Sequence, residues 1–573
     1  MKNMKKILAL LVAVLMMLSV MVPAIADDYT GDTSVKVTGL AEGDVAHFYQ
    51  VLEWVGGAAQ DNVAGWKAKA PFDTILTKAK LTEVLVGTAA TETEEKKPAT
   101  GITAELANDL AKAASGEGTV INAAKVDEAY IATLPTTEAG MWMGLITPAD
   151  ANTIYNPVFV SADFDKTNTA GDAAVVDTAT YSDSAAPKKS TVDLTKTAEN
   201  TADYTGDHAG TTAVNDIVTY TVNTTIPGYG KVYDNPHFKL TDTLTNLTLQ
   251  KKEGSSDYDI TVTGIDAANY DLVATDTGYT LTVKEAYLKA TIPATSITIV
   301  YKAKVDESAA TTSKAINEED NEVQIEYSHT PTDETDYDVK KDTTQHYTFT
   351  LDASGMGWGQ NVSGKKTSEL VKVGRDAAGN PITERTETSQ VTNTETWTSP
   401  LAGAQFGLWK NAECTGDAYL TATTEADGRM TFAGLDAGNY WLKEIQAPTG
   451  FVTNDTIVPV VISATLKSVK VTETILGKTV TYDTDILESY TVSVNGETNA
   501  SYQFKNQDTA SSNDIKWDVA ECVEKPHQFE NIQGIELPHT GGMGTTLLYV
   551  GGSILVLLAV ILLVTKRRMN AED

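Results

Sequence analysis

The chain has 573 residues, of which 44 are Lys or Arg and 77 are Asp or Glu, so its formal net charge is −33. An acidic surface of this strength repels nucleic acid and keeps a protein soluble, which excludes nucleic acid as a partner. Cys414 and Cys522 are the only cysteines, so one disulfide is the maximum, and the sequence leaves their pairing open.

The N-terminus has the pattern of a secretion signal. Three lysines precede an apolar run over 7–22, and Ala24-Ile25-Ala26 then places small residues where a signal peptidase cuts. The alternative, an N-terminal membrane anchor, is disfavoured because the apolar run is short for a bilayer and ends at Pro23. We predict a signal peptide over 1–26 that is removed on export.

The segment 27–187 is predicted to be a mixed α+β domain. Alternating strands are indicated over 34–40 and 46–51, and helical periodicity is found near 73–86 and over 103–114. The segment ends at Pro187-Lys188-Lys189-Ser190, a polar junction that leads into the next unit.

Three strands of the segment 188–345 can be phased by the two-residue alternation of a half-buried sheet. Lys196 shares its face with Val192 and Leu194. By the same rule Asp242 shares the face of Leu240, and Asn321 shares one face with the apolar residues at every second position after it. The alternation therefore predicts a lysine, a carboxylic acid and an amide among apolar neighbours.

Burial of these groups favours their neutral forms, because a lone buried charge is costly. A neutral amine is a nucleophile, a protonated acid donates a hydrogen bond, and a carboxamide can lose ammonia when attacked. We predict an amide bond between Lys196 and Asn321, promoted by Asp242. The alternative is three unrelated boundary residues with ordinary polar contacts.

The segment 346–534 holds a second candidate set. Glu444 shares a strand face with Tyr440 and Leu442, and Lys372 is the best donor, although Val371 and Val373 form the more apolar face of its strand. Alternation alone does not decide between two asparagines as the acceptor. Asn506 shares a face with Tyr502 and Phe504, and Asn531 shares one with Phe529.

The C-terminus combines three features in a fixed order. The pentapeptide Leu537-Pro538-His539-Thr540-Gly541 precedes an apolar stretch over 547–564, and Lys566-Arg567-Arg568 follows it. The apolar stretch is about long enough to span a bilayer, and the basic cluster would hold the tail inside the cell. A plain membrane anchor explains the last two features and not the pentapeptide.

This C-terminus resembles the sorting signal of sortase substrates, over 535–573. The 188–345 segment is similar to the isopeptide-forming middle domain of Gram-positive pilins, through 218–227 and the strands of Asp242 and Asn321. The series from 400–408 to 447–451 is similar to the collagen-adhesin B-type domain. The resemblance implies a mostly β fold, with tandem immunoglobulin-like sandwiches after an N-terminal mixed pilin domain.

The resemblance also implies roles for individual residues. A sortase cysteine would attack the carbonyl of Thr540, release Gly541 onward and pass the acyl group to an amine. In related pilins the linking lysine lies where Lys188 and Lys189 lie here, although the usual Tyr-Pro-Lys form is absent. Glu444 would shuttle protons, and the position just before the sorting signal favours Asn531 over Asn506 as the acceptor.

We therefore expect a pilus subunit that is not an enzyme. Its expected partners are a sortase, other copies of itself, accessory pilins and peptidoglycan, with host ligands left open and the membrane contacted only transiently through the C-terminal helix. The alternative is a monomeric wall-anchored adhesin or a pilus-base subunit. The seven histidines have no metal-ligand spacing, and we expect no metal or cofactor.

Overall fold

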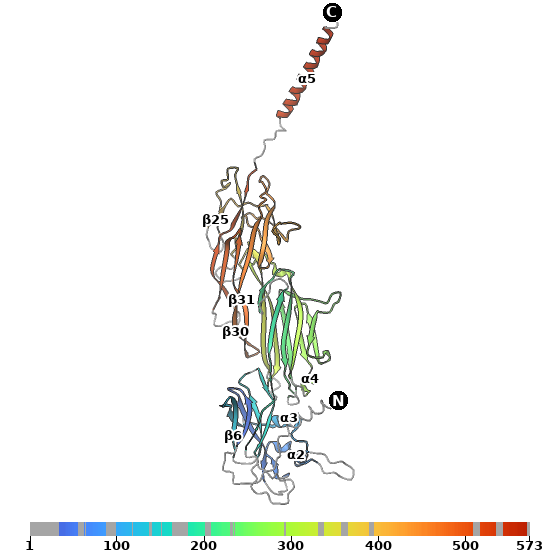
Figure 1. Ribbon diagram of the computed structural model, residues 1–573, viewed down its shortest axis with the longest axis vertical. Helices are drawn as coiled ribbons and strands as arrows, with labels where there is room; N and C mark the ends of the chain where they lie inside the picture. Colours follow the sequence, from blue (N-terminus) through green and yellow to red (C-terminus); the bar gives the residue numbers. More distant parts are fainter. Residues whose placement is uncertain are drawn as a thin grey trace.

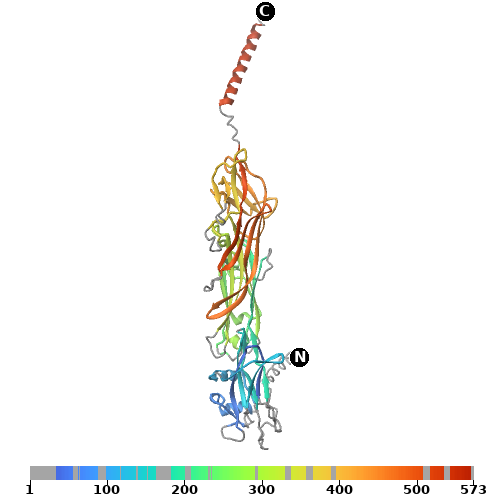
Figure 2. The ribbon, with the colours of Figure 1, turned by 90° about the vertical axis from the view of Figure 1, so that its left-hand side faces the viewer.

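The computed structural model describes residues 34–55, 62–63, 65–87, 99–116, 118–136, 140–150, 152–162, 182–200, 208–229, 233, 235–290, 294–329, 337–356, 365–388, 395–507, 516–534 and 543–569. The predicted signal peptide and the pentapeptide Leu537–Gly541 lie outside these residues. The described chain is mostly β, and it forms an elongated molecule in which three β units follow one another (Figure 1, Figure 2).

The first unit has two sheets, in the orders β10-β1-β6-β5 and β3-β2-β7-β9, with β4 beside β2 and a small β8–β11 pair. The helices α2 and α3 fall within the two predicted helical regions, and each is capped by a threonine: the Lys80 N–H donates to Thr77, and the Leu106 N–H donates to Thr103. The elements are β1 (Ser34–Leu40), β2 (Val45–Trp54), β3 (Trp66–Ala68), η1 (Phe72–Thr74), α2 (Lys78–Leu85), α3 (Ala104–Ala113), β4 (Thr119–Asn122), β5 (Ala124–Val126), β6 (Ala129–Pro135), β7 (Gly140–Thr147), β8 (Thr153–Tyr155), β9 (Val158–Ala162), β10 (Ser182–Ala185) and β11 (Lys189–Thr191).

The second unit is a sandwich of two sheets, in the orders β12-β14-β20-β16 and β13-β22-β21-β15-β19-β18. Its strands alternate buried and exposed residues, and the inward-facing residues of both sheets form one core. The elements are β12 (Leu194–Asn200), β13 (Ala209–Thr211), β14 (Ile217–Ile226), β15 (Phe238–Thr245), β16 (Leu247–Leu249), β17 (Ile260–Thr263), η3 (Ala267–Asn269), β18 (Tyr270–Thr275), β19 (Gly278–Val283), α4 (Glu285–Lys289), β20 (Thr295–Val305), η4 (Glu307–Ala309), β21 (Ile316–Ser328) and β22 (Tyr337–Leu351).

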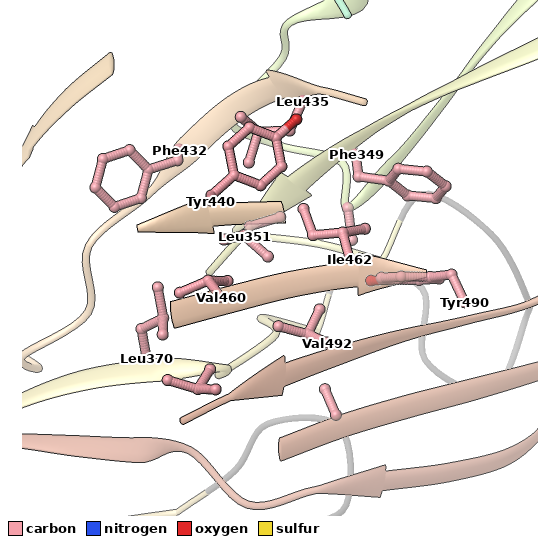
Figure 3. Close-up of a cluster of buried hydrophobic side chains, with 14 of the residues drawn as sticks. Phe349, Leu351, Leu370, Phe432, Leu435, Tyr440, Val460, Ile462, Tyr490 and Val492 are labelled. Carbon is pink, nitrogen blue, oxygen red and sulfur yellow. The ribbon is translucent and has the colours of Figure 1, made fainter. Parts of the chain in front are cut away.

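The third unit is built on a seven-stranded sheet in the order β27-β26-β29-β30-β31-β32-β33, with the parallel pair β23–β34 and the hairpin β24–β25 beside it. Phe432, Tyr440, Val460 and Tyr490 are among the side chains of its core (Figure 3). The elements are β23 (Leu370–Arg375), β24 (Thr386–Thr388), β25 (Glu395–Thr398), β26 (Gln405–Trp409), β27 (Leu420–Thr423), β28 (Phe432–Leu435), β29 (Gly438–Gln446), β30 (Val458–Ile475), β31 (Lys478–Val494), β32 (Glu497–Gln507), β33 (Lys516–Glu524) and β34 (His527–Ile532).

The second and third units share structure. The predicted boundary between 345 and 346 falls inside β22, which pairs with β21 in one unit and with β28 of the next. The long β30–β31 hairpin also reaches the second unit, where Glu473 pairs with Lys341 at 2.9 Å and Thr343 donates to Thr484 at 3.0 Å. One strand and one hairpin therefore tie the two cores together.

The C-terminal helix α5 (Met543–Met569) includes the predicted apolar stretch. Its segment Leu548–Arg568 has a mean hydropathy of 2.6 and is long and apolar enough to cross a membrane. Its last turn carries Lys566, Arg567 and Arg568, the basic residues that the sequence places after the span.

Candidate functional sites

The structure brings Lys196, Asp242 and Asn321 together in the core of the second unit. Lys196 comes from β12 in one sheet, whereas Asp242 on β15 and Asn321 on β21 come from the facing sheet. The Lys196 Nζ donates to Oδ2 of Asp242 at 2.5 Å and also donates to Oδ1 of Asn321. All three side chains are buried, with exposures of 0%, 2% and 0%. The amine therefore lies against both the acid and the carboxamide.

A tyrosine completes this first site, and sequence reasoning missed it. The Tyr301 hydroxyl on β20 donates to Oδ2 of Asp242 at 2.7 Å and accepts from Nδ2 of Asn321 at 2.8 Å. Its ring stacks on that of Tyr220, with centroids 5.3 Å apart, and Lys196 Nζ lies 5.6 Å from the Tyr301 ring centroid. The alternation Ile297, Ile299, Tyr301 could have placed it on the inner face.

The electrostatics of the first site favour neutral groups. Burial lowers the pKa of Lys196, although the Asp242 charge opposes that change. Burial raises the pKa of Asp242, against the opposing effect of Lys196. Both shifts favour transfer of the proton from the ammonium to the carboxylate, toward an amine and a carboxylic acid. An amine in contact with a carboxamide has the arrangement required for nucleophilic attack.

Lys372, Glu444 and Asn531 meet in the same way in the third unit. Lys372 on β23 and Asn531 on β34 lie on adjacent parallel strands, and Lys372 Nζ donates to Oδ1 of Asn531. Lys372 Nζ lies 3.1 Å from Oε1 of Glu444, and Nδ2 of Asn531 donates to Oε1 and Oε2 of Glu444 at 3.0 and 3.1 Å. The three exposures are 0%, 3% and 1%.

The ambiguity in the sequence around Lys372 has a structural cause. Residues 370–374 of β23 are buried on both faces, with Leu370 in the main core and Val371 and Val373 packed with Trp397 of β25. Alternation therefore cannot identify an inner face. Burial lowers the pKa of Lys372, which favours the neutral amine.

The remaining predicted residues have different outcomes. Lys188 and Lys189 are both exposed, and Lys189 opens β11, which pairs with β8 of the first unit. Asn506, the second candidate acceptor, lies on β32 opposite Trp517. Cys414 and Cys522 are free thiols, so they do not pair. Among the residues that the structure describes, no group of His, Cys, Asp and Glu could hold a metal ion.

Two family models match parts of the chain. The model described as LPXTG cell wall anchor motif matches residues 530–571, and the one described as SpaA prealbumin-like fold domain matches residues 387–475. The chain is a cell-wall-anchored surface protein of the Gram-positive type. The anchor model confirms the predicted sorting signal, and an LPXTG motif implies processing by a sortase. The predicted resemblance to Gram-positive pilins is confirmed as well.

Individual proteins resemble this surface protein along most of its length. The trypsin-resistant surface T6 protein of Streptococcus pyogenes serotype M6 is 23% identical over 488 residues, which cover 76% of this chain and 80% of the relative. Among solved structures, the T6 backbone pilin of S. pyogenes has a TM-score of 0.49 at 17% identity, covering 89% of this chain and all of that one. The major pilin SpaD of Corynebacterium diphtheriae has a TM-score of 0.42 at 14% identity, covering 89% and 98%.

Proposed function

We propose that the protein is a structural subunit of a covalently polymerised, wall-anchored pilus. The observation that carries the proposal is the combination of two buried Lys–carboxyl–Asn sites with an LPXTG anchor on one chain. Internal bonds strengthen a subunit against tension, and the anchor supplies the acyl group for joining subunits. We assign 27–187 to an N-terminal pilin domain, 188–345 to an isopeptide-forming immunoglobulin-like domain and 346–534 to a collagen-adhesin B-type domain.

The reaction at the first site joins Lys196 to Asn321. The neutral Nζ attacks Cγ of Asn321, the Asp242 acid donates its proton toward the departing amine, and ammonia leaves as the C–N bond forms. The proton that the lysine nitrogen loses replaces the proton that Asp242 gave. Tyr301, which bonds both Asp242 and Nδ2 of Asn321, supplies a path between the acid and the leaving nitrogen. The products are one amide and one ammonia.

The reaction at the second site is the same, but it involves fewer side chains. Nζ of Lys372 attacks Cγ of Asn531, and Glu444 bonds the leaving Nδ2 directly, so no tyrosine relay is needed. The loop that this bond closes spans 159 residues. In the unfolded-chain picture, a link of that span stabilises a fold by about 5 kcal/mol. Such links also oppose proteolysis, and the curated relative is named for trypsin resistance.

Polymerisation requires an amine on a neighbouring copy. A sortase thiolate attacks the Thr540 carbonyl and expels the amine of Gly541. The amine of Lys188 or Lys189 of another copy then displaces the thiolate and forms an amide. Both lysines are exposed, as an amine that enters an enzyme must be. Accessory pilins would join through the same chemistry, and the terminal subunit would join peptidoglycan.

A gel of wall extracts boiled in detergent tests the polymer. We expect a ladder of covalent multimers, and we expect the double variant Lys188→Ala/Lys189→Ala to abolish it. Exposed Lys251→Ala and Lys252→Ala on the second unit are the matched control and should leave the ladder intact. A single band from the wild type would instead identify a monomeric wall-anchored adhesin or a pilus-base subunit.

A further inference from the structure

Three buried carboxyl groups of the third unit are linked by hydrogen bonds, directly or through one tyrosine. Asp352 follows β22, Glu369 precedes β23, and Glu524 ends β33, with exposures of 2%, 0% and 5%. Two of them are tied reciprocally: the Glu369 N–H donates to Oδ1 of Asp352, and the Asp352 N–H donates to Oε2 of Glu369, both at 2.7 Å. Burial, followed by the Glu369 charge, raises the pKa of Asp352. The proposed cross-linking reaction uses none of the three.

One hydroxyl joins two of these carboxyls. The Tyr502 hydroxyl lies 2.8 Å from Oε1 of Glu369 and 3.2 Å from Oε1 of Glu524. A hydroxyl has one proton, so it can donate to only one of two carboxylates. Both contacts are hydrogen bonds only if the other carboxyl is protonated and donates to the tyrosine oxygen. Burial, followed by the Glu369 charge, raises the pKa of Glu524 to about 8, so the pair keeps this proton at neutral pH.

The neighbouring bonds indicate where the shared proton lies. Oε2 of Glu369 accepts from the Asp352 N–H, whereas Oε1 faces the Tyr502 hydroxyl. Oε1 of Glu524 already accepts from the Ser368 N–H. The arrangement that agrees with these contacts has the Tyr502 hydroxyl donating to Oε1 of Glu369, at the shorter distance, and the protonated Glu524 donating to the Tyr502 oxygen. We call this the Glu369–Tyr502–Glu524 bridge.

The charged and polar groups around the bridge do not neutralise its second carboxylate, so the shared proton is still required. The Arg429 guanidinium contributes positive charge, but it already pairs with Asp427 at 2.5 Å. Asp352 adds a third carboxyl. The Tyr490 ring stacks on Tyr502 with centroids 4.8 Å apart, and Cys522 lies opposite Tyr502 on β33. Burial raises the pKa of both the Tyr490 hydroxyl and the Cys522 thiol, so neither contributes charge at neutral pH.

The bridge lies at the start of β23 and β34, the two strands that carry Lys372 and Asn531. The carbonyl of Glu369 accepts from the His527 N–H at 2.9 Å, which joins the start of β23 to the start of β34. Three residues further along β23 is Lys372, which lies opposite Phe529 in the parallel pairing. A slip of one residue would turn its side chain to the other face.

We propose that the Glu369–Tyr502–Glu524 bridge, with its one shared proton, is a positioning device that sets the register of β23 on β34 for the Lys372–Asn531 reaction. The inference rests on the proposed cross-link. The bridge touches neither the amine nor the carboxamide, so it acts through the strands. Because the folded pair binds a proton that an unfolded glutamate releases above pH 4.5, its stabilising effect falls between pH 4.5 and 8 and then levels off.

Two variants of the full mature chain test the bridge against a control. Glu524→Gln replaces the protonated acid by an uncharged amide that does not titrate, and Tyr502→Phe removes the shared hydroxyl. Tyr440→Phe removes another buried hydroxyl of the same core, one that donates to a backbone carbonyl. The first readout is the rate at which the Lys372–Asn531 bond forms in chain made by cell-free synthesis, followed by mass spectrometry. The second is the pH dependence of unfolding in an Asn531→Ala background, which keeps the ion pair of Lys372 but cannot form the bond.

Each readout has an expected and an overturning result. We expect Tyr502→Phe to form the bond at least tenfold more slowly than Tyr440→Phe. We expect Glu524→Gln to form the bond at the wild-type rate, and its equilibrium constant for unfolding should rise less steeply between pH 5 and 8, by up to about tenfold less per pH unit. A wild-type pH slope in Glu524→Gln overturns the bridge, even if Tyr502→Phe does not fold. A wild-type chain that never loses ammonia at Asn531 refutes the cross-link itself, while the pH comparison still decides the bridge.

Discussion

Removal of the acceptor in the second unit should destabilise that unit by a predictable amount. Asn321→Ala leaves Lys196 paired with Asp242 but removes the acceptor of the proposed Lys196–Asn321 bond, which would close a loop of 125 residues. For a loop of that length, chain entropy gives about 5 kcal/mol, which is a large part of the stability of a single domain. At roughly 2–4 °C per kcal/mol for a unit of this size, the unfolding midpoint should fall by about 10–20 °C.

The assay is calorimetric unfolding of the mature chain, with intact mass measured on the same samples. Asn317→Ala is the matched control, because Asn317 lies on the same strand, is also buried and accepts one hydrogen bond, from Thr311. It should cost about 1 kcal/mol. Each bond removes one ammonia, roughly 17 Da. Unfolding of Asn321→Ala at the temperature of the control, or a wild type that carries its full calculated mass, would refute the Lys196–Asn321 bond.

Three further predictions concern individual side chains. Glu444→Gln should leave Lys372 and Asn531 unjoined, which mass spectrometry of the linked peptides would detect; an intact bond would exclude proton transfer by Glu444. Tyr301→Phe should slow the first bond on the order of a hundredfold, as measured by the mass of freshly synthesised chain, and an unchanged rate would remove Tyr301 from the relay. Burial lowers the pKa of His346 from 6.5 to about 4, so the wild type should lose stability as pH falls from 6.5 to 4, by up to tenfold per unit, in pH-dependent unfolding curves. In His346→Gln the loss of stability with falling pH should be less steep. A loss as steep as in the wild type would show that His346 is not its cause.

Strand alternation was sufficient to find the three polar residues of the first site because each lies on a regular strand with one buried face. Lys196, Asp242 and Asn321 point inward for the same reason as their apolar neighbours. Tyr301 is equally regular on β20, but a buried tyrosine is ordinary in a core, so the pattern does not mark it as functional. Its role depends on which strand of the facing sheet lies opposite, which local sequence does not contain.

The third unit shows where local patterns are insufficient. Lys372 lies on a strand that is buried on both faces by the β24–β25 hairpin and the main core, so its orientation depends on long-range packing. The contact of Tyr502 with Glu369 likewise joins residues more than a hundred positions apart. The same limit explains why the boundary predicted at 345–346 falls inside a strand, because β22 continues from one core into the next.

In the proposed pilus, the acyl group of Thr540 is bonded to a lysine of another copy. Wall-released polymers from wild-type cells can be digested with a protease and searched by mass spectrometry for branched peptides. We predict a branch in which the carbonyl of Thr540 is joined to Nζ of Lys188 or Lys189, with Gly541 and everything after it absent. Recovery of Thr540 joined only to peptidoglycan, or still followed by Gly541, would contradict it.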